Sequence, residues 1–140
     1  KEGQEKPPKN TASRLYALCA MRLHISYFYA MEEKTLPELW AQSAPEQLLE
    51  AWCAQLNKDL AGLGVTLRLP LDAAEAVSCF NEQLVPVMER ALGQPGDALW
   101  QCLYVVDVPE PAPMDAEGLA DAVLRRTLLK VLLRFKYRMA

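Results

Sequence analysis

Few residues in this sequence could perform catalysis, and His24 is the only histidine. A Ser-His-Asp or Cys-His arrangement would have to use it as the base. Cys19 lies five residues before it, so on a helix the two side chains would not face each other. We interpret His24 as a core or lining residue and do not predict an enzyme. The alternative is a small-molecule-binding or enzymatic domain with a pocket around His24, Tyr27 and Tyr29.

Metal and cofactor sites are not indicated by any spacing of ligands. The chain has no CxxC or CxH pair and no H-x-x-E or E-x-x-H spacing, which zinc and redox sites commonly use. Gly62-Leu63-Gly64 lacks the G-x-G-x-x-G pattern of a dinucleotide site. We expect no metal, no cofactor and reduced, buried thiols of the kind found in the cytoplasm. The four cysteines are Cys19, Cys53, Cys79 and Cys102.

A row of cations is the clearest candidate binding feature. Arg126, Lys130, Arg134 and Arg138 recur at steps of four and form a basic ridge on one face of the predicted last helix. Residues 122–140 carry six basic and no acidic side chains, whereas residues 32–121 carry sixteen acidic and four basic ones. We favour internal pairing of these two segments over an exposed basic surface for a partner.

The first helix is predicted over residues 14–31, where apolar side chains occur on every face. Such a helix is typical of a protein interior. A membrane span needs about 20 apolar residues. Arg22 and His24 interrupt this shorter run, so no transmembrane segment is predicted. The face with the clearest helical spacing consists of Leu18, Met21, Ile25 and Phe28.

Three short motifs predict helix starts. Thr35-Leu36-Pro37-Glu38 and Ser43-Ala44-Pro45-Glu46 both allow a hydroxyl to cap the first turn and a glutamate to reach back. Proline is harmless in a first turn because its missing N–H would have no partner there. We therefore expect a short helix from Leu36 and a longer one from Ala44. Asp72-Ala73-Ala74-Glu75 is a third start of similar chemistry.

Two segments have the composition of short strands. VTLRL, residues 65–69, alternates in polarity, and LYVVDV, residues 103–108, is rich in valine. A short β-hairpin between them is therefore allowed. The second segment also continues the apolar spacing of a helix that Asp97 can cap, and we favour this helix.

Prolines constrain the second half of the chain. Pro86 falls inside an apolar helical stripe, so we expect a kink or a break near Leu84–Val85. Three further prolines predict a stiff linker over residues 108–114. Asp115 then opens a last helix that should end near Arg138.

These elements predict a mainly α fold. We expect a flexible tail over residues 1–12 and one helical bundle of about five or six helices over residues 13–140. The chain begins with Lys1, which we interpret as a processed or truncated start. Tryptophans 40, 52 and 100 are expected in the core. The other predicted core residues are Leu18, Met21, Ile25, Phe28, Leu49, Leu56, Leu60, Val77, Phe80, Leu84, Leu103, Leu128, Val131 and Phe135.

The predicted function is a non-enzymatic protein-interaction or scaffolding domain that binds a protein partner or a second copy of itself. Tyrosine, tryptophan and arginine, which dominate interface energetics, are well represented. The net charge of −3 and the pI of about 5.2 disfavour nucleic acid as the partner. Contact of the basic last helix with nucleic acid or an anionic membrane surface is the weaker alternative.

Overall fold

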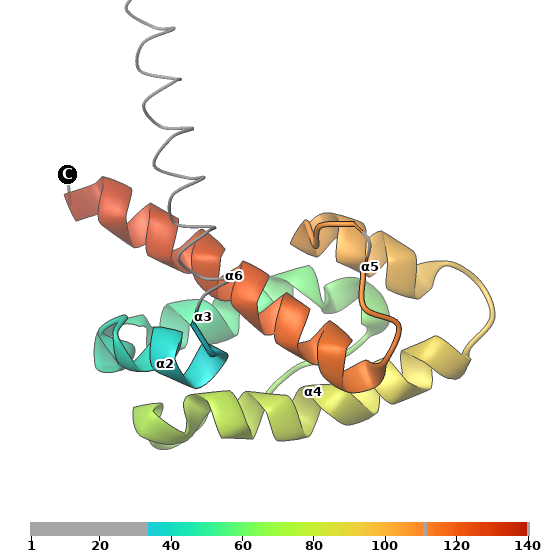
Figure 1. Cartoon of the computed structure of the whole chain (residues 1–140), viewed down its shortest axis with the longest axis horizontal. Helices are drawn as coiled ribbons and strands as arrows, with labels where there is room; N and C mark the ends of the chain where they lie inside the picture. The colour runs from blue at the N-terminus through green and yellow to red at the C-terminus, as the bar shows by residue number, and fades with distance from the viewer. Residues whose placement is uncertain (1–33, 111, 140) are drawn as a thin grey trace, which may run out of the picture. The chain divides into compact units, whose positions relative to one another are not determined.

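The computed structural model describes residues 34–110 and 112–139, with side chains described up to residue 136. These residues are mainly helical, as predicted, and contain no strand (Figure 1). The predicted tail over residues 1–12, the helix over residues 14–31 and its predicted core side chains lie outside the described residues. The described α-helices are α2 Leu36–Ala41, α3 Pro45–Asp59, α4 Ala76–Gly93, α5 Ala98–Val106 and α6 Ala116–Met139, with 3-10 turns η2 Ala61–Leu63 and η3 Ala73–Glu75.

Helix α2 begins with the predicted capping box. The Thr35 hydroxyl accepts a bond from the Glu38 N–H at 3.3 Å, and the Glu38 carboxylate accepts one from the Thr35 N–H at 2.9 Å. These bonds satisfy two donors that a helix start leaves free. The carboxylate is favoured by its bonds to Thr35, first from the backbone and then from the side chain, which lower the pKa of Glu38.

Helix α3 begins at Pro45, one residue after the predicted start at Ala44, and the predicted cap at Ser43 is wrong. Ala44 occupies the cap position with a left-handed φ of 55° and makes no side-chain cap bond. The Ser43 hydroxyl instead donates back to the Leu39 carbonyl at the end of α2. Because the connection between α2 and α3 is so short, the same serine cannot both close one helix and cap the next.

The segment predicted as the strand VTLRL is extended but is not a strand, and the β-hairpin alternative is wrong. Asn57 of α3 accepts from the Leu67 N–H at 2.7 Å and donates to its carbonyl at 3.2 Å. Gln83 of α4 likewise accepts from the Arg68 N–H at 2.7 Å and donates to the Arg68 carbonyl at 3.1 Å. Two side-chain amides therefore provide the hydrogen bonds that a neighbouring strand would supply.

Helix α4 is continuous from Ala76 to Gly93, so the break that was one of the two outcomes expected near Leu84–Val85 does not occur. Because Pro86 has no N–H, the Glu82 carbonyl lacks its usual hydrogen-bond donor in the helix. Both residues are exposed, so water can satisfy this carbonyl. Helix α5 follows and includes Leu103–Val106, the second half of the hairpin alternative. It ends at Asp107, which has a left-handed φ of 72°.

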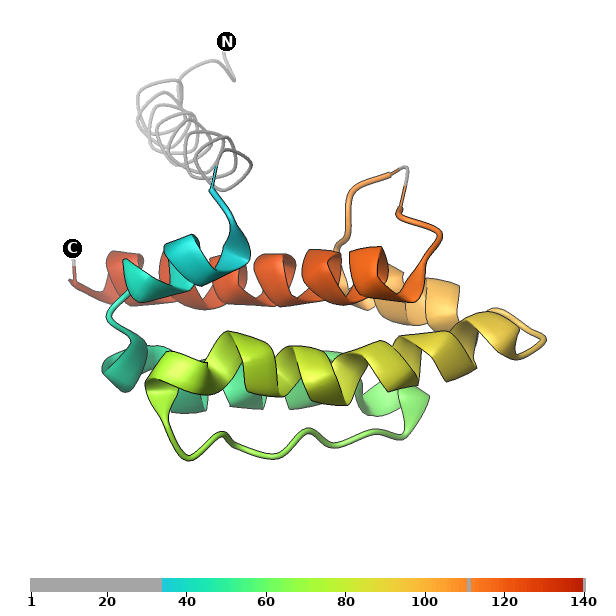
Figure 2. The ribbon, with the colours of Figure 1, turned by 60° about the horizontal axis from the view of Figure 1, so that its bottom comes forward.

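Helix α6 lies across α3 and α4, with which it makes its most extensive contacts (Figure 2). The predicted start at Asp115 is confirmed, since its carboxylate accepts from the Gly118 N–H at 3.0 Å. A side chain at residue 118 would have its Cβ 2.8 Å from Pro113 Cβ, so glycine lets the linker pack against this first turn.

Aromatic residues occupy the centre of the core. The ring centroids of Trp40 and Trp52 are 4.6 Å apart, and Phe80 packs edge-on to Trp52 at 5.0 Å. Both indole N–H groups are satisfied, Trp40 by the Ala73 carbonyl at 2.7 Å and Trp52 by Thr127 at 3.0 Å. The predicted core residues confirmed as buried are Leu49, Trp40, Trp52, Leu56, Leu60, Phe80, Leu84, Leu103, Leu128 and Val131.

Three core predictions are wrong. Val77 and Phe135 are only half-buried. Trp100 is 44% exposed. The inner face of α5 is filled by Leu99, Cys102, Leu103 and Val106, which leaves the neighbouring positions of this nine-residue helix facing outward.

Candidate functional site

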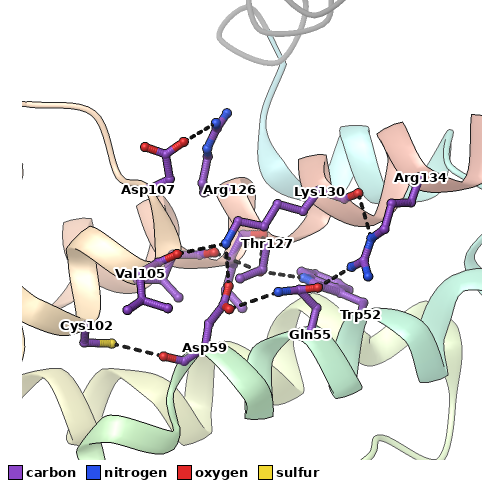
Figure 3. Close-up of polar contacts among 12 residues, drawn as sticks. Trp52, Gln55, Asp59, Cys102, Val105, Asp107, Arg126, Thr127, Lys130 and Arg134 are labelled. Carbon is purple, nitrogen blue, oxygen red and sulfur yellow. Dashed lines mark hydrogen bonds and ion pairs between the residues drawn. The ribbon is translucent and has the colours of Figure 1, made fainter. Parts of the chain in front are cut away.

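Two cations of the basic ridge form ion pairs within the described part of the chain (Figure 3). Lys130 Nζ lies 2.8 Å from Asp59 Oδ2 and also donates to the Val105 carbonyl at 3.1 Å. Arg126 Nη2 lies 2.7 Å from Asp107 Oδ2. Both carboxylates belong to the acidic segment over residues 32–121. The ridge is therefore used largely to join α6 to α3 and to the end of α5.

The Lys130 pair continues into a ladder of polar contacts between α3 and α6. Asp59 Oδ1 accepts from Gln55 Nε2 at 3.0 Å, and the Gln55 amide oxygen accepts from Arg134. Arg134 Nε also donates to the Lys130 carbonyl at 3.4 Å. We call Gln55, Asp59, Lys130 and Arg134 the α3–α6 ladder. The Asp59 side chain is only 4% exposed, so its charge depends on these partners.

Arg138, the fourth residue of the predicted ridge, belongs to α6, but its side chain lies outside the described part. His24, Tyr27 and Tyr29, the residues of the alternative pocket, also lie outside the described residues. The structure therefore brings together three of the four predicted ridge residues. It leaves the alternative pocket as a prediction.

The described cysteines are free thiols, and two of them are poor nucleophiles. Burial first, and the nearby Asp59 carboxylate second, raise the pKa of Cys102 to about 11. Burial also raises the pKa of Cys53. Because the thiolate is the reactive form, neither residue is poised for nucleophilic chemistry near neutral pH. Cys79 is half-buried beside Gln83, whose Nε2 lies 3.5 Å from its sulfur.

Among residues 34–110 and 112–139, no three His, Cys, Asp or Glu side chains converge as metal ligands would. No helix within these ranges combines the length and apolar character that a membrane crossing requires.

The outer face of α5 is a surface that sequence reasoning missed. Trp100 is 44% exposed, Tyr104 87% and Val105 56%, and Gln101 is exposed beside them. We call these four residues the α5 face. It contains no ionisable carboxylate or cation. The signal in the sequence was an uncharged run, ALWQCLYVV, with its two aromatic residues four positions apart.

A groove between α3 and α6 is the second missed surface. Its volume is about 450 Å³. Two cations, Lys58 and Arg134, lie among its lining residues, and no carboxylate does. The alanines within α3 were the only signal of this groove in the sequence. The groove itself depends on how α6 crosses α3, which no local pattern indicates. The remaining lining residues are Gln47, Leu48, Ala51, Ala54, Gln55, Val131 and Phe135.

Comparison with protein-family models, with curated proteins and with solved structures finds no match to this chain. The features of this chain that indicate a function are therefore these two surfaces and the ladder between α3 and α6.

Proposed function

We propose that this chain is a non-enzymatic protein-interaction domain that binds a second copy of itself through the α5 face. The observation that carries the proposal is the exposure of Trp100, Tyr104 and Val105 together on one short helix. Aromatic residues of this kind dominate the energetics of protein interfaces because each buries a large area with few rotatable bonds. Single exposed apolar residues need no explanation, but three adjacent ones on an uncharged face favour a partner.

Charge supports a second copy as the partner. In a two-fold dimer the same patch meets itself, so any charge on it would face a like charge. The α5 face has none, and Asp107 at its end is already paired with Arg126. Elsewhere, residues 34–140 carry fourteen acidic and ten basic side chains, so most other self-contacts would bring carboxylates together.

The size of the face predicts a weak dimer. Helix α5 has nine residues, which corresponds to a length of about 14 Å. A stable interface usually buries about 800 Å² on each partner, more than one face of so short a helix supplies. We therefore expect a dissociation constant of roughly micromolar or weaker.

Light scattering coupled to size exclusion, over a wide range of protein concentration, tests this proposal. The weight-average mass should rise with concentration in the wild type and stay monomeric in Tyr104→Glu. Leu71→Glu is the matched control, because Leu71 is fully exposed outside α5 and also gains a carboxylate. A monomer at every concentration contradicts the proposal, as does an equal effect of the two substitutions.

Two broader proposals accompany this one. We propose that the described helices form a single bundle, supported by the packing of α6 on α3 and α4. We also propose a reducing, cytoplasmic setting. It is supported by the free thiols of Cys53, Cys79 and Cys102.

A further inference from the structure

The groove between α3 and α6 has an apolar end and a cationic end. Lys130 pairs with Asp59 and Arg134 contacts Gln55, so α6 runs antiparallel to α3 here (Figure 3). Lys58 lies one turn along α3 from Gln55, so Lys58 and Arg134 share one end of the groove. The other end contains the apolar side chains Leu48 and Ala51 of α3, while Phe135 lies next to Arg134 on α6.

Within the described residues, Lys58 and Arg134 have no carboxylate partner. Arg126 and Lys130 of α6, in contrast, each pair with one. Arg134 donates to the neutral Gln55 amide and to the Lys130 carbonyl, neither of which offsets its charge. An arginine has five N–H donors in a planar fork, so most of them remain available. The domain has an excess of carboxylates, but the only charged side chains that line this groove are cations. Such a groove favours an acidic ligand.

We propose that this groove binds an amphipathic helix of a partner protein that carries carboxylates at one end of its apolar face. Exposed Ala51 and Ala54 leave room for a helix to approach α3 closely, and half-buried Phe135 supplies apolar contact. Carboxylates of the partner helix would pair with Lys58 and Arg134. The groove is open along one side, so a protein segment with one wet face fits it better than a ligand that must be enclosed.

This inference is independent of self-association, since the groove and the α5 face share no residue. The two proposals can therefore fail separately. Binding to the groove should persist in Tyr104→Glu, which removes the proposed dimer contact. Loss of peptide binding in that variant would mean that the two surfaces are one site, which contradicts the assignment of the groove.

Fluorescence anisotropy with two labelled helical peptides tests the groove. Both peptides carry one leucine stripe, and one has glutamates at an end of it where the other has glutamines. The glutamate peptide should bind more tightly, and Lys58→Gln with Arg134→Gln should weaken its binding about tenfold. The same two substitutions should weaken binding of the glutamine peptide by a much smaller factor, because that peptide has no carboxylates to pair with the two cations.

Two controls keep this experiment decisive. Arg90→Gln removes an exposed cation on α4, outside the groove, and should leave the affinity unchanged. Ala54→Tyr fills the groove without changing charge and should abolish binding, while circular dichroism checks that each variant folds. Equal affinity for both peptides overturns the proposal. So does binding of the glutamate peptide that neither groove variant weakens, or direct binding of a fatty acid by a protein that binds neither peptide.

Discussion

The charge of Asp59 is the most consequential detail at the scale of single residues. Its side chain is almost fully buried, and Lys130 and Gln55 compensate for that burial. Removing one partner of such a pair leaves a charge without its counterion in a low-dielectric setting, which costs far more than the intact pair contributes. The ladder therefore helps to hold α6 against α3 beside the groove.

Lys130→Met should accordingly lower the free energy of unfolding by about 3 kcal/mol, measured by urea denaturation. Asp121→Asn is the matched control, because Asp121 pairs with Arg125 at 2.7 Å with its side chain 49% exposed. Exposed pairs contribute less than about 1 kcal/mol. Adding Asp59→Leu to Lys130→Met should recover much of the lost stability. Equal costs for Lys130→Met and Asp121→Asn would show that the ladder has no special role.

The thiol of Cys102 predicts how stability changes at high pH. Its pKa rises from an ordinary 9.0 to about 11 in the folded protein because of burial and the nearby Asp59 carboxylate. Between these values the unfolded chain has released a proton that the folded chain retains, so the free energy of unfolding should fall as pH rises. Urea denaturation from pH 8 to 10.5 should show a shallower fall in Cys102→Ala. Identical slopes would mean that Cys102 titrates normally.

At the scale of elements, the extended segment before η3 is held by two side-chain amides rather than by a strand. Asn57 alone makes two hydrogen bonds to the main chain of buried Leu67. Without it, these backbone groups have to find other partners, and an unsatisfied buried polar group costs about 1–3 kcal/mol. The segment connects α3 to α4. Its hydrogen bonds to Asn57 and Gln83 therefore help to fix these two helices relative to each other.

Asn57→Ala should therefore destabilise the protein by about 2 kcal/mol in thermal or urea unfolding. Gln94→Ala is a suitable control, since Gln94 is exposed after α4, and such surface changes usually stay within about 0.5 kcal/mol. Hydrogen exchange should also quicken at the Leu67 amide in Asn57→Ala, because this amide donates to Asn57. An unchanged exchange rate at Leu67 would contradict the role assigned to the amide.

Helix starts could be predicted from the sequence where their bonds are local. Thr35 with Glu38 and Asp115 with Gly118 each bond within three residues, so the motif contains the whole interaction. The hydrogen bonds between Asn57 and Leu67 join residues ten positions apart, and no local sequence pattern indicates them. The groove and the α5 face were missed for the same reason, because both depend on which faces the other helices cover.

For the described part as a whole, pairing across α6 accounts for part of the uneven charge of the sequence. The basic ridge contacts Asp59 and Asp107 from the acidic segment, as the favoured interpretation of the sequence expected. This pairing leaves less of the ridge to attract nucleic acid or anionic lipid. The exposed features proposed here to bind a partner are the uncharged α5 face and the cationic end of the groove.

Collisional quenching of tryptophan fluorescence is the most direct test of self-association through α5. The chain has three tryptophans, of which Trp40 and Trp52 are buried and Trp100 is exposed, so iodide should quench Trp100 selectively. In the wild type the quenchable fraction should fall as protein concentration rises, because Trp100 becomes covered, and in Tyr104→Glu it should stay constant. A quenchable fraction independent of concentration in the wild type would contradict the account.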